Sequence, residues 1–333
     1  MPACHAGGRG FESRPVRHFD SHIARANTAS SIMSVPIPLL TPHLDRVDCE
    51  FLRERDIAFD VLRLDCMHPQ LHGNKWFKLK YNVQFIQENS IKTVLSFGGA
   101  WSNHLYALAA AGRHFGFRTI GIVRGEIVEP LNPVLRFARE RGMELVAVSR
   151  SDYRLREEPE FIESLQEKFG EFMLLPEGGS NALAVRGCAD IAEHLDWQGA
   201  TRPGYLGLAC GTGTTLAGVV SGLTAHSQQP MPSVLGVAVL NAPGYLEREV
   251  RRWLPGGAAT RWTILEQYHA GGYAKSSPEL AAFLQEFAAY SAIPLEPVYT
   301  GKLIYGLFDQ IRTGGIPAGS HVIALHTGGI VSQ

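Results

Sequence analysis

The stretch "YLGLACGTGTTLAGVV" (residues 205–220) joins an apolar run to a glycine-containing turn and a helix-like segment. Gly211 and Gly213 allow the backbone of the turn to approach a ligand closely. Hydroxyl groups follow at the start of the helix, where the helix dipole favours an anion. They belong to Thr212, Thr214 and Thr215. The stretch predicts a strand, a phosphate-binding loop and a helix.

Two better-known phosphate motifs do not fit this loop. The dinucleotide fingerprint needs glycine at position 216, where leucine stands, and the Walker loop needs a Gly-Lys-Ser/Thr sequence that is absent. The motif itself leaves two interpretations, a phosphate site or only a tight turn between strand and helix. We favour the phosphate site.

Outward from this stretch, short apolar runs alternate with longer helix-like segments. This alternation is typical of βαβ units and a parallel sheet, so the fold class is predicted as α/β. Several of the runs end in glycine, where a strand of an α/β fold leads into a ligand-facing loop. The other expected strands are "DVLRL" (60–64), "TVLSFGG" (93–99), "RTIGIVRG" (118–125), "ELVAVSR" (144–150), "FMLLPEGG" (172–179), "SVLGVAVL" (233–240) and "HVIALHTGG" (321–329).

Composition narrows the class of partner. The 333 residues carry a formal net charge of -1, which gives no electrostatic reason for a nucleic-acid partner and suits a small neutral or zwitterionic ligand. No apolar run approaches the roughly 20 residues of a membrane span, so we expect no membrane association. Five scattered cysteines without a Cys-x-x-Cys pair indicate neither a disulfide framework nor a metal site. A cytoplasmic location is the simplest expectation.

The first 32 residues differ from the rest of the chain. They are rich in arginine but contain no apolar core of a secretory signal, and Glu12 and Asp20 weaken a transit-peptide interpretation. We expect this segment to be unstructured or to be upstream sequence, with synthesis starting at Met33.

A lysine follows Gly-Asn in "GNKWFKLKY" (residues 73–81), at the start of a predicted helix. Asn74 is expected at the N-cap of this helix. Lys75 lies at the positive end of the helix dipole, which lowers the pKa of an amine and favours a reactive one. Taken alone, the motif favours a solvated surface lysine over a reactive one. One buried face is expected from Trp76, Leu79, Val83 and Ile86.

Polar groups gather in "SFGGAWSNHLYA" (residues 96–107). Gly98 and Gly99 end a predicted strand, and the segment Ser102, Asn103 and His104 opens a helix. Hydroxyl, amide and free N–H groups at one point suit a carboxylate. The alternative is an ordinary N-cap after a loop, and the motif taken alone favours it.

Near the C-terminus, "EPVYTGKLIYG" (296–306) and "LHTGG" (325–329) place Tyr299 and Thr327 beside glycines. A single tyrosine in a loop is more often a core residue than an acid. Its phenol matters where a neighbouring group needs a proton.

Seven motifs along residues 36–329, taken in order, resemble those of a family of enzymes that depend on pyridoxal 5'-phosphate. This family contains 1-aminocyclopropane-1-carboxylate deaminase and D-cysteine desulfhydrase. The motifs are "GNKWFKLKY", "SFGGAWSNH", "LPEGGSN", "ACGTGTTLAG", "GGYAKS", "EPVYTGK" and "HTGG". The resemblance implies a tryptophan-synthase-β-like architecture (fold type II), with the cofactor in the cleft between two α/β domains. It implies a larger cofactor-binding domain of residues 33–77 and 181–333, a smaller domain of residues 78–180, and a homodimer.

The resemblance also implies the residues that contact the cofactor. Lys75 becomes its covalent attachment point, and Asn103 a hydrogen-bond donor to its ring hydroxyl. Thr327 becomes the neighbour of the pyridine nitrogen. The phosphate would lie on Gly211, Thr212, Gly213, Thr214 and Thr215. Lys78 and Lys80 are left as solvent-facing or domain-edge charges.

The substrate side follows from the same resemblance. Ser102, Asn103 and His104 correspond to the segment that binds the substrate carboxylate, and Ser102 also to a proton-transfer residue. Tyr273 and Tyr299 correspond to two active-site tyrosines.

Departures from the family pattern concern the substrate. Ring-opening deaminases of this family carry glutamate directly after the tyrosine that corresponds to Tyr299. This chain has Thr300 at that position, as desulfhydrase-like members do. Phe77, Ala274 and Lys275 also depart from the common pattern. The implied activity is α,β-elimination on a small amino acid, most like D-cysteine to hydrogen sulfide, pyruvate and ammonia. The alternatives are 1-aminocyclopropane-1-carboxylate deaminase, another amino-acid deaminase or racemase, and a cofactor-binding protein without turnover.

Overall fold

The computed structural model describes residues 37–195, 203–225, 230–254, 256 and 258–329. The expectations for residues 1–32 and for a start at Met33 lie outside the described residues.

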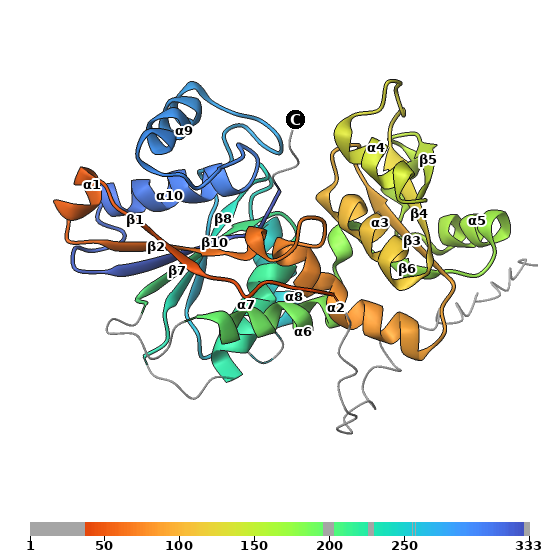
Figure 1. Cartoon of the computed structure of the whole chain (residues 1–333), viewed down its shortest axis with the longest axis horizontal. Helices are drawn as coiled ribbons and strands as arrows, with labels where there is room; N and C mark the ends of the chain where they lie inside the picture. Colours follow the sequence, from red (N-terminus) through yellow and green to blue (C-terminus); the bar gives the residue numbers. More distant parts are fainter. Residues whose placement is uncertain (1–36, 196–202, 226–229, 255, 257, 330–333) are drawn as a thin grey trace, which may run out of the picture.

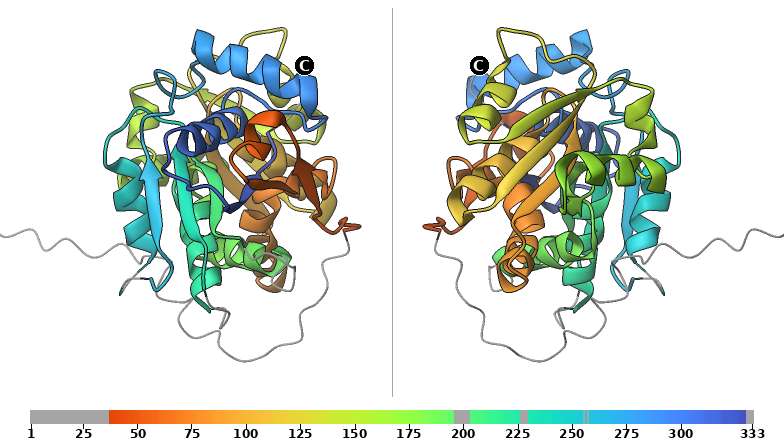
Figure 2. Two further views of the ribbon diagram at one scale, coloured as in Figure 1. Left: turned by 90° about the vertical axis from the view of Figure 1, so that its left-hand side faces the viewer. Right: turned by 90° about the vertical axis from the view of Figure 1, so that its right-hand side faces the viewer.

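Two sheets stand side by side (Figure 1), and from either end of the molecule one lies in front of the other (Figure 2). The larger has six strands in the order β1-β2-β10-β7-β8-β9, in which β1 is antiparallel to β2 and each other neighbouring pair is parallel. Its strands are β1 (Leu44–Val47), β2 (Ala58–Arg63), β7 (Tyr205–Cys210), β8 (Ser233–Ala238), β9 (Trp262–Leu265) and β10 (His321–His326).

The smaller sheet is parallel throughout, in the order β5-β4-β3-β6. Its central strand β3 is buried along its whole length, as expected of a parallel sheet covered on both faces. The strands are β3 (Thr93–Gly98), β4 (Arg118–Arg124), β5 (Glu144–Val148) and β6 (Met173–Leu175).

All eight strands expected from the sequence are present, and the α/β prediction is confirmed. Strands β1 and β9 were not expected from the sequence. Both have four residues and lie at the edges of the larger sheet, where a strand needs no continuous apolar run.

Helices cover both sheets, and α2 lies between them, packed against α3 and α6 (Figure 1). The predicted buried face of α2 is confirmed, because Trp76, Leu79, Val83 and Ile86 are at most 6% exposed. The helices are α1 (Glu50–Arg53), α2 (Gly73–Glu88), α3 (Asn103–Phe115), α4 (Pro133–Glu140), α5 (Pro159–Phe169), α6 (Ala182–Ala189), α7 (Thr214–Ala225), α8 (Tyr245–Trp253), α9 (Pro278–Tyr290) and α10 (Thr300–Arg312). Short 3-10 turns are η3 (Leu64–Cys66), η4 (Asp152–Leu155), η5 (Glu177–Gly179) and η6 (Asp190–His194).

The start of α2 differs from the prediction. The N-cap is His72, and Asn74, expected at the cap, lies inside the first turn. The reason is Gly73, whose φ of +63° turns the chain into the helix two residues earlier. A Cβ atom on Gly73 would lie 2.1 Å from the Thr327 carbonyl oxygen, so the backbones of α2 and the loop after β10 touch.

Gly73→Ala is expected to lower the free energy of unfolding by at least about 2 kcal/mol more than Gly116→Ala. Both glycines have positive φ values, +63° and +77°, so alanine carries a similar backbone cost at each. At Gly116 nothing lies within 4 Å of the added methyl group, whereas at Gly73 it meets a carbonyl oxygen. Urea unfolding of the two variants measures the difference, and equal losses would contradict the close approach.

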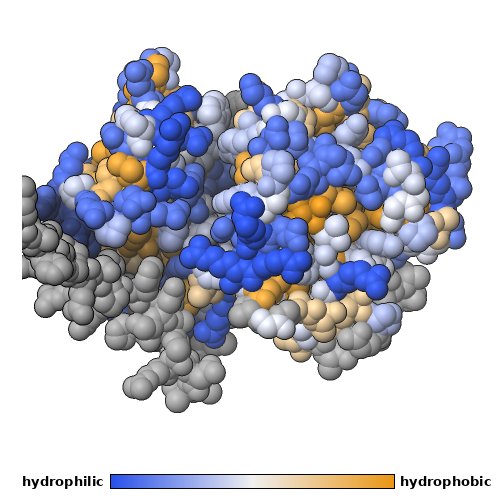
Figure 3. Space-filling view, turned by 180° about the vertical axis from the view of Figure 1, so that it is seen from behind, coloured by the Kyte–Doolittle hydropathy of each residue, from blue (hydrophilic) through white to orange (hydrophobic). Residues whose placement is uncertain are grey.

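The face seen from behind is largely hydrophilic, with hydrophobic residues in scattered groups (Figure 3). In the described part of the chain, no helix has both the length and the apolar character of a membrane span.

Candidate active site

The glycine-threonine turn between β7 and α7 forms a polar cradle. Thr212 is its centre, since its Oγ1 accepts a hydrogen bond from Ser180 Oγ (3.0 Å) and lies 3.4 Å from Thr214 Oγ1. Gly213 has a φ of +74°, and a Cβ atom there would lie 3.0 Å from Val250 Cγ2. The first N–H groups of α7 have no acceptor within the helix, so they are available to an anion above the turn.

Lys78 completes this cradle, contrary to the expectation of a solvent-facing charge. The residue is 3% exposed, and its Nζ donates to the Gly178 carbonyl oxygen (2.9 Å) and to Thr212 Oγ1 (3.2 Å). Burial lowers the pKa of Lys78. The sequence signal was available, because position 78 is one turn beyond Lys75, on the same side of α2. Lys80, in contrast, lies at the helix edge and pairs with Asp190.

Lys75 lies beside the same cradle. Its Nζ donates to Asn74 Oδ1 (2.9 Å), and Asn74 Nδ2 in turn donates to Thr215 Oγ1 (2.9 Å). Burial, with a smaller contribution from the charge of Lys78, lowers the pKa of Lys75 to about 7. A large share of this amine is therefore neutral and nucleophilic at neutral pH.

After removal of any cofactor, acetylation of Lys75 is expected to be half-maximal near pH 7 and to level off at higher pH. The neutral amine is the reacting form, so the rate rises as pH increases through a pKa of about 7. Peptide mapping by mass spectrometry measures the rate, with Lys168 as the internal reference for reagent reactivity. A midpoint above pH 9 would contradict the shifted pKa.

Ser102 is the N-cap of α3, as the alternative interpretation of its motif had it. Its Oγ accepts a hydrogen bond from the Leu105 N–H (3.3 Å). Asn103 is the first residue of α3, and its side chain lies close to Gly329 in the loop after β10 of the larger sheet. A Cβ atom placed on Gly329 would be 3.3 Å from Asn103 Nδ2. The N-terminus of α3 thus faces the loop after β10.

His104 is buried with one ring nitrogen unpaired. The Ser96 hydroxyl donates to the Leu175 carbonyl oxygen (2.7 Å), so its oxygen accepts from His104 Nε2 (2.9 Å). This assignment leaves Nδ1 as an acceptor, and Nδ1 is buried without a partner among the described residues. Burial, followed by the charges of Lys75 and Lys78, lowers the pKa of His104 well below its ordinary value. The imidazole is neutral.

The two tyrosines meet above the cradle. Tyr299 Oη lies 3.3 Å from Tyr273 Oη, and the two rings are edge to face. A Cβ atom on Gly211 would lie 3.5 Å from Tyr299 Cε1, which places the Tyr299 ring over the turn. Burial, and then Tyr273, raise the pKa of Tyr299 well above 10.0, so its phenol remains protonated.

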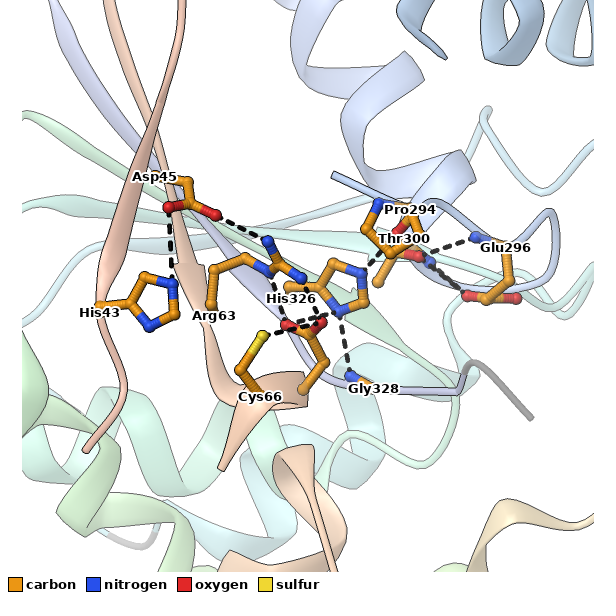
Figure 4. A network of polar contacts seen from close by, with 10 residues as sticks. His43, Asp45, Arg63, Cys66, Pro294, Glu296, Thr300, His326 and Gly328 are labelled. Atoms are coloured by element: carbon orange, nitrogen blue, oxygen red, sulfur yellow. Dashed lines mark hydrogen bonds and ion pairs between the residues drawn. The ribbon is translucent and has the colours of Figure 1, made fainter. Parts of the chain in front are cut away.

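Thr327 follows β10 and is 7% exposed; its carbonyl oxygen accepts from the Asn74 N–H (3.3 Å). The preceding His326 anchors this loop (Figure 4): its Nε2 donates to the Pro294 carbonyl oxygen (2.8 Å), and its Nδ1 lies 3.3 Å from Asp65 Oδ1. Arg63 holds Asp65 through both carboxylate oxygens, at 2.9 and 2.7 Å. This network joins the loop of Thr327 to the loop before α10.

A carboxylate that was not predicted as a site residue, that of Glu296, lies beside Thr300. Glu296 caps α10 by accepting from the backbone N–H groups of Val298 (2.6 Å), Tyr299 (2.8 Å) and Thr300 (2.6 Å). The Thr300 hydroxyl donates to the same carboxylate (3.1 Å, Figure 4). A Cβ atom on Gly329 would lie 3.5 Å from Glu296 Cγ, so this carboxylate borders the candidate site.

Residues 52–328 match the family described as pyridoxal-phosphate dependent enzyme. The chain belongs to this family. Within it, the chain is 33% identical, over 78% of its length and 84% of the relative, to a putative 1-aminocyclopropane-1-carboxylate deaminase of Thermotoga maritima. It is 28% identical to the mitochondrial bifunctional D-cysteine desulfhydrase/1-aminocyclopropane-1-carboxylate deaminase of Arabidopsis thaliana, over 81% of this chain and 72% of that one. A crystal structure of a 1-aminocyclopropane-1-carboxylate deaminase homologue superimposes with a TM-score of 0.75 at 25% identity, covering 88% of this chain and 90% of that one.

The resemblance to the deaminase and desulfhydrase family and the fold type II architecture are thereby confirmed, and this pyridoxal-phosphate dependent enzyme is a lyase or deaminase. The residues present fit the cofactor. The cradle of Thr212, Gly213 and Lys78 suits a phosphate, and the buried Lys75 amine lies within two hydrogen bonds of the cradle.

Proposed function

We propose that this enzyme catalyses α,β-elimination on a small amino acid, most like D-cysteine, to give hydrogen sulfide, pyruvate and ammonia. The observation that carries the proposal is the position of the Tyr299 phenol above the turn at Gly211. A protonated phenol there can donate to a departing thiolate. Thr300, whose hydroxyl is engaged by Glu296, agrees with the desulfhydrase-like pattern of the sequence.

In this proposal the cofactor is held from both sheets. Lys75 is the covalent attachment point, and the phosphate lies on the turn Gly211, Thr212, Gly213, Thr214 and Thr215, with Lys78 as its counter-charge. Asn103 and Thr327 contact the ring from the N-terminus of α3 and from the loop after β10. Bound pyridoxal 5'-phosphate supplies an electron sink for the negative charge left on the substrate α-carbon.

Side chains and backbone groups of the protein bind the substrate and transfer its protons. The N-terminus of α3, with Ser102, Asn103 and His104, binds the substrate carboxylate, since its free N–H groups favour an anion. The neutral amine of Lys75 accepts the α-proton. Tyr299 donates a proton to the sulfur, and Tyr273, which is 41% exposed, relays a proton from solvent.

Tyr299→Phe is expected to reduce kcat for elimination by about 10²-fold, because it removes the proton donor and keeps the ring. The absorbance of the bound cofactor should stay unchanged, since the ring above Gly211 is retained. Tyr273→Phe serves as the matched control with a smaller loss, because its hydroxyl is more exposed. A kcat within twofold of wild type for Tyr299→Phe would contradict the role.

A substrate panel tests the reaction. Purified enzyme is given D-cysteine, L-cysteine, D-serine and 1-aminocyclopropane-1-carboxylate, and sulfide, pyruvate, 2-oxobutanoate and ammonia are measured. We expect equal amounts of sulfide, pyruvate and ammonia from D-cysteine and the highest kcat/KM for it. Pyruvate failing to match sulfide, or a higher kcat/KM for another substrate, would reject the proposal.

Ring-opening deamination is the second candidate, and one observation favours it. The Glu296 carboxylate accepts hydrogen bonds from Thr300, so an acidic group lies next to the position where ring-opening deaminases carry glutamate and this chain has threonine. In the same panel, 2-oxobutanoate from 1-aminocyclopropane-1-carboxylate would identify this activity.

We further propose a homodimer in the cytoplasm, on the basis of the family resemblance and the free cysteines among the described residues. We also propose the division into residues 33–77 with 181–333 and residues 78–180, with the boundary falling within α2. Light scattering after size exclusion measures the oligomer, and a monomer would contradict it.

A further inference from the structure

A cavity of about 320 Å³ lies at the carboxyl end of the smaller sheet, outside the proposed cofactor site. We name it the arginine pocket. Arg124 comes from the end of β4, Tyr153 and Arg154 from η4, and Glu177 from the turn after β6. It is lined by Arg124, Arg150, Tyr153, Arg154, Arg156 and Glu177.

Positive charge in the arginine pocket exceeds negative charge. Arg156 Nε pairs with Glu177 Oε2 at 3.0 Å, and Glu177 is the pocket's one acidic lining residue. In the described ranges of the chain, Arg124, Arg150 and Arg154 form no ion pair. Converging guanidinium groups repel one another unless an anion lies between them, and their planar forks suit carboxylate or phosphate oxygens.

Tyr153 gives a second, independent indication of a ligand. The residue is 2% exposed, and its ring packs edge to face on Phe97 with centroids 5.9 Å apart. Its hydroxyl is buried without a hydrogen-bond partner among the residues that the structure describes. Buried tyrosine hydroxyls ordinarily find a partner. Burial and the nearby Glu177 carboxylate raise the pKa of Tyr153, so this hydroxyl stays protonated and can donate to a ligand in the pocket or to Glu177.

The arginine pocket adjoins the candidate active site through two glycine loops. A Cβ atom on Gly99 would lie 3.7 Å from Arg124 Nη2, and Gly99 precedes the Ser102 turn. Glu177 continues into Gly178, where a Cβ atom would lie 3.0 Å from Thr212 Cγ2. An anion that competes with Glu177 for Arg156 would thus act next to the phosphate cradle.

We propose that the arginine pocket binds a small dianion, a phosphate group or a dicarboxylate, in addition to the cofactor. Arg124, Arg150 and Arg154, which form no ion pair in the described ranges, supply donors together with the Tyr153 hydroxyl, and Glu177 is the acidic residue of the lining. The pocket is small, and the whole chain carries a net charge of -1, which favours a small molecule over a nucleic acid.

The test titrates the holoenzyme with inorganic phosphate and, separately, with malonate at constant ionic strength, by isothermal calorimetry. The cofactor-loaded protein is used so that phosphate does not occupy the cradle, and the cofactor absorbance is followed throughout. The variants are the double substitution Arg150→Gln with Arg154→Gln, and Tyr153→Phe, which keeps the packing on Phe97. Arg136→Gln, an exposed arginine on α4, is the matched control for loss of charge.

We expect saturable binding of at least one dianion with an unchanged cofactor spectrum. The double variant should weaken it by about tenfold or more, Tyr153→Phe by a smaller factor, and Arg136→Gln by less than twofold. Tighter phosphate binding identifies a phosphorylated ligand, and tighter malonate binding identifies a dicarboxylate. Absence of saturable binding, equal weakening by Arg136→Gln, or displacement of the cofactor would overturn the proposal. These outcomes do not depend on which amino acid the enzyme converts.

Discussion

Lys75→Ala is expected to lower kcat for any amino-acid substrate by at least about 10³-fold and to remove the covalent attachment of the cofactor. In the proposed mechanism this one amine both holds the cofactor and accepts the α-proton. Its pKa of about 7 is what makes the neutral amine available for both roles. Stopped assays of product and the visible absorbance of the purified protein measure the two losses.

Lys80→Ala is the matched control, because it removes a lysine from the same helix at an edge position paired with Asp190. It should leave both readouts within about twofold, since a partly exposed ion pair contributes little. Borohydride reduction followed by peptide mapping should place the cofactor on Lys75. A label on another lysine, or more than a tenth of wild-type activity in Lys75→Ala, would refute the assignment.

Lys78→Ala is expected to raise the dissociation constant of the cofactor by about 10- to 100-fold, the range of a lost hydrogen bond to a charged group. The Lys78 ammonium bridges Gly178 and Thr212 at the cradle, so its removal takes the counter-charge from the proposed phosphate site. Equilibrium dialysis of the cofactor measures the change.

A second readout separates an electrostatic role from a structural one. The charge of Lys78 helps to lower the pKa of Lys75, so the midpoint of Lys75 acetylation in Lys78→Ala should move to higher pH. Lys80→Ala should move neither quantity. Cofactor affinity equal to wild type in Lys78→Ala would show that the phosphate lies elsewhere.

Local sequence was sufficient for much of the fold. Alternating apolar runs gave the eight strands that make up most of both sheets, and the spacing of Trp76, Leu79, Val83 and Ile86 gave the buried face of α2. Gly116 ends α3 in the left-handed conformation, as expected from a glycine after a helix. The short edge strands β1 and β9 were not predicted, because their pairing with neighbouring strands defines them and neither contains a long apolar run.

The candidate site likewise contains residues whose roles were predicted from the sequence and residues whose surroundings were not. The family resemblance of the ordered motifs predicted roles for Lys75 and Tyr299, whereas residue type and position alone favoured a surface lysine and a core tyrosine. The glycine-threonine turn was predicted from its own residues, because a phosphate-binding loop is a local feature. The surroundings of Lys78 and Lys80 could not be read from those motifs. Whether a lysine on α2 meets solvent or the Thr212 turn depends on how loops some 100 or more positions away pack against the helix.

The sequence by itself determined which helices and strands form and which reactive side chains lie at their ends. Strand periodicity, glycine conformation and helix starts are properties of residues that are neighbours in the chain. Tertiary structure alone decided the protonation and partners of those groups. Burial set the pKa of Lys75, the Ser96 hydroxyl set the tautomer of His104, and Glu296 engaged the hydroxyl of Thr300. These outcomes depend on desolvation and on hydrogen bonds between segments that only folding brings together.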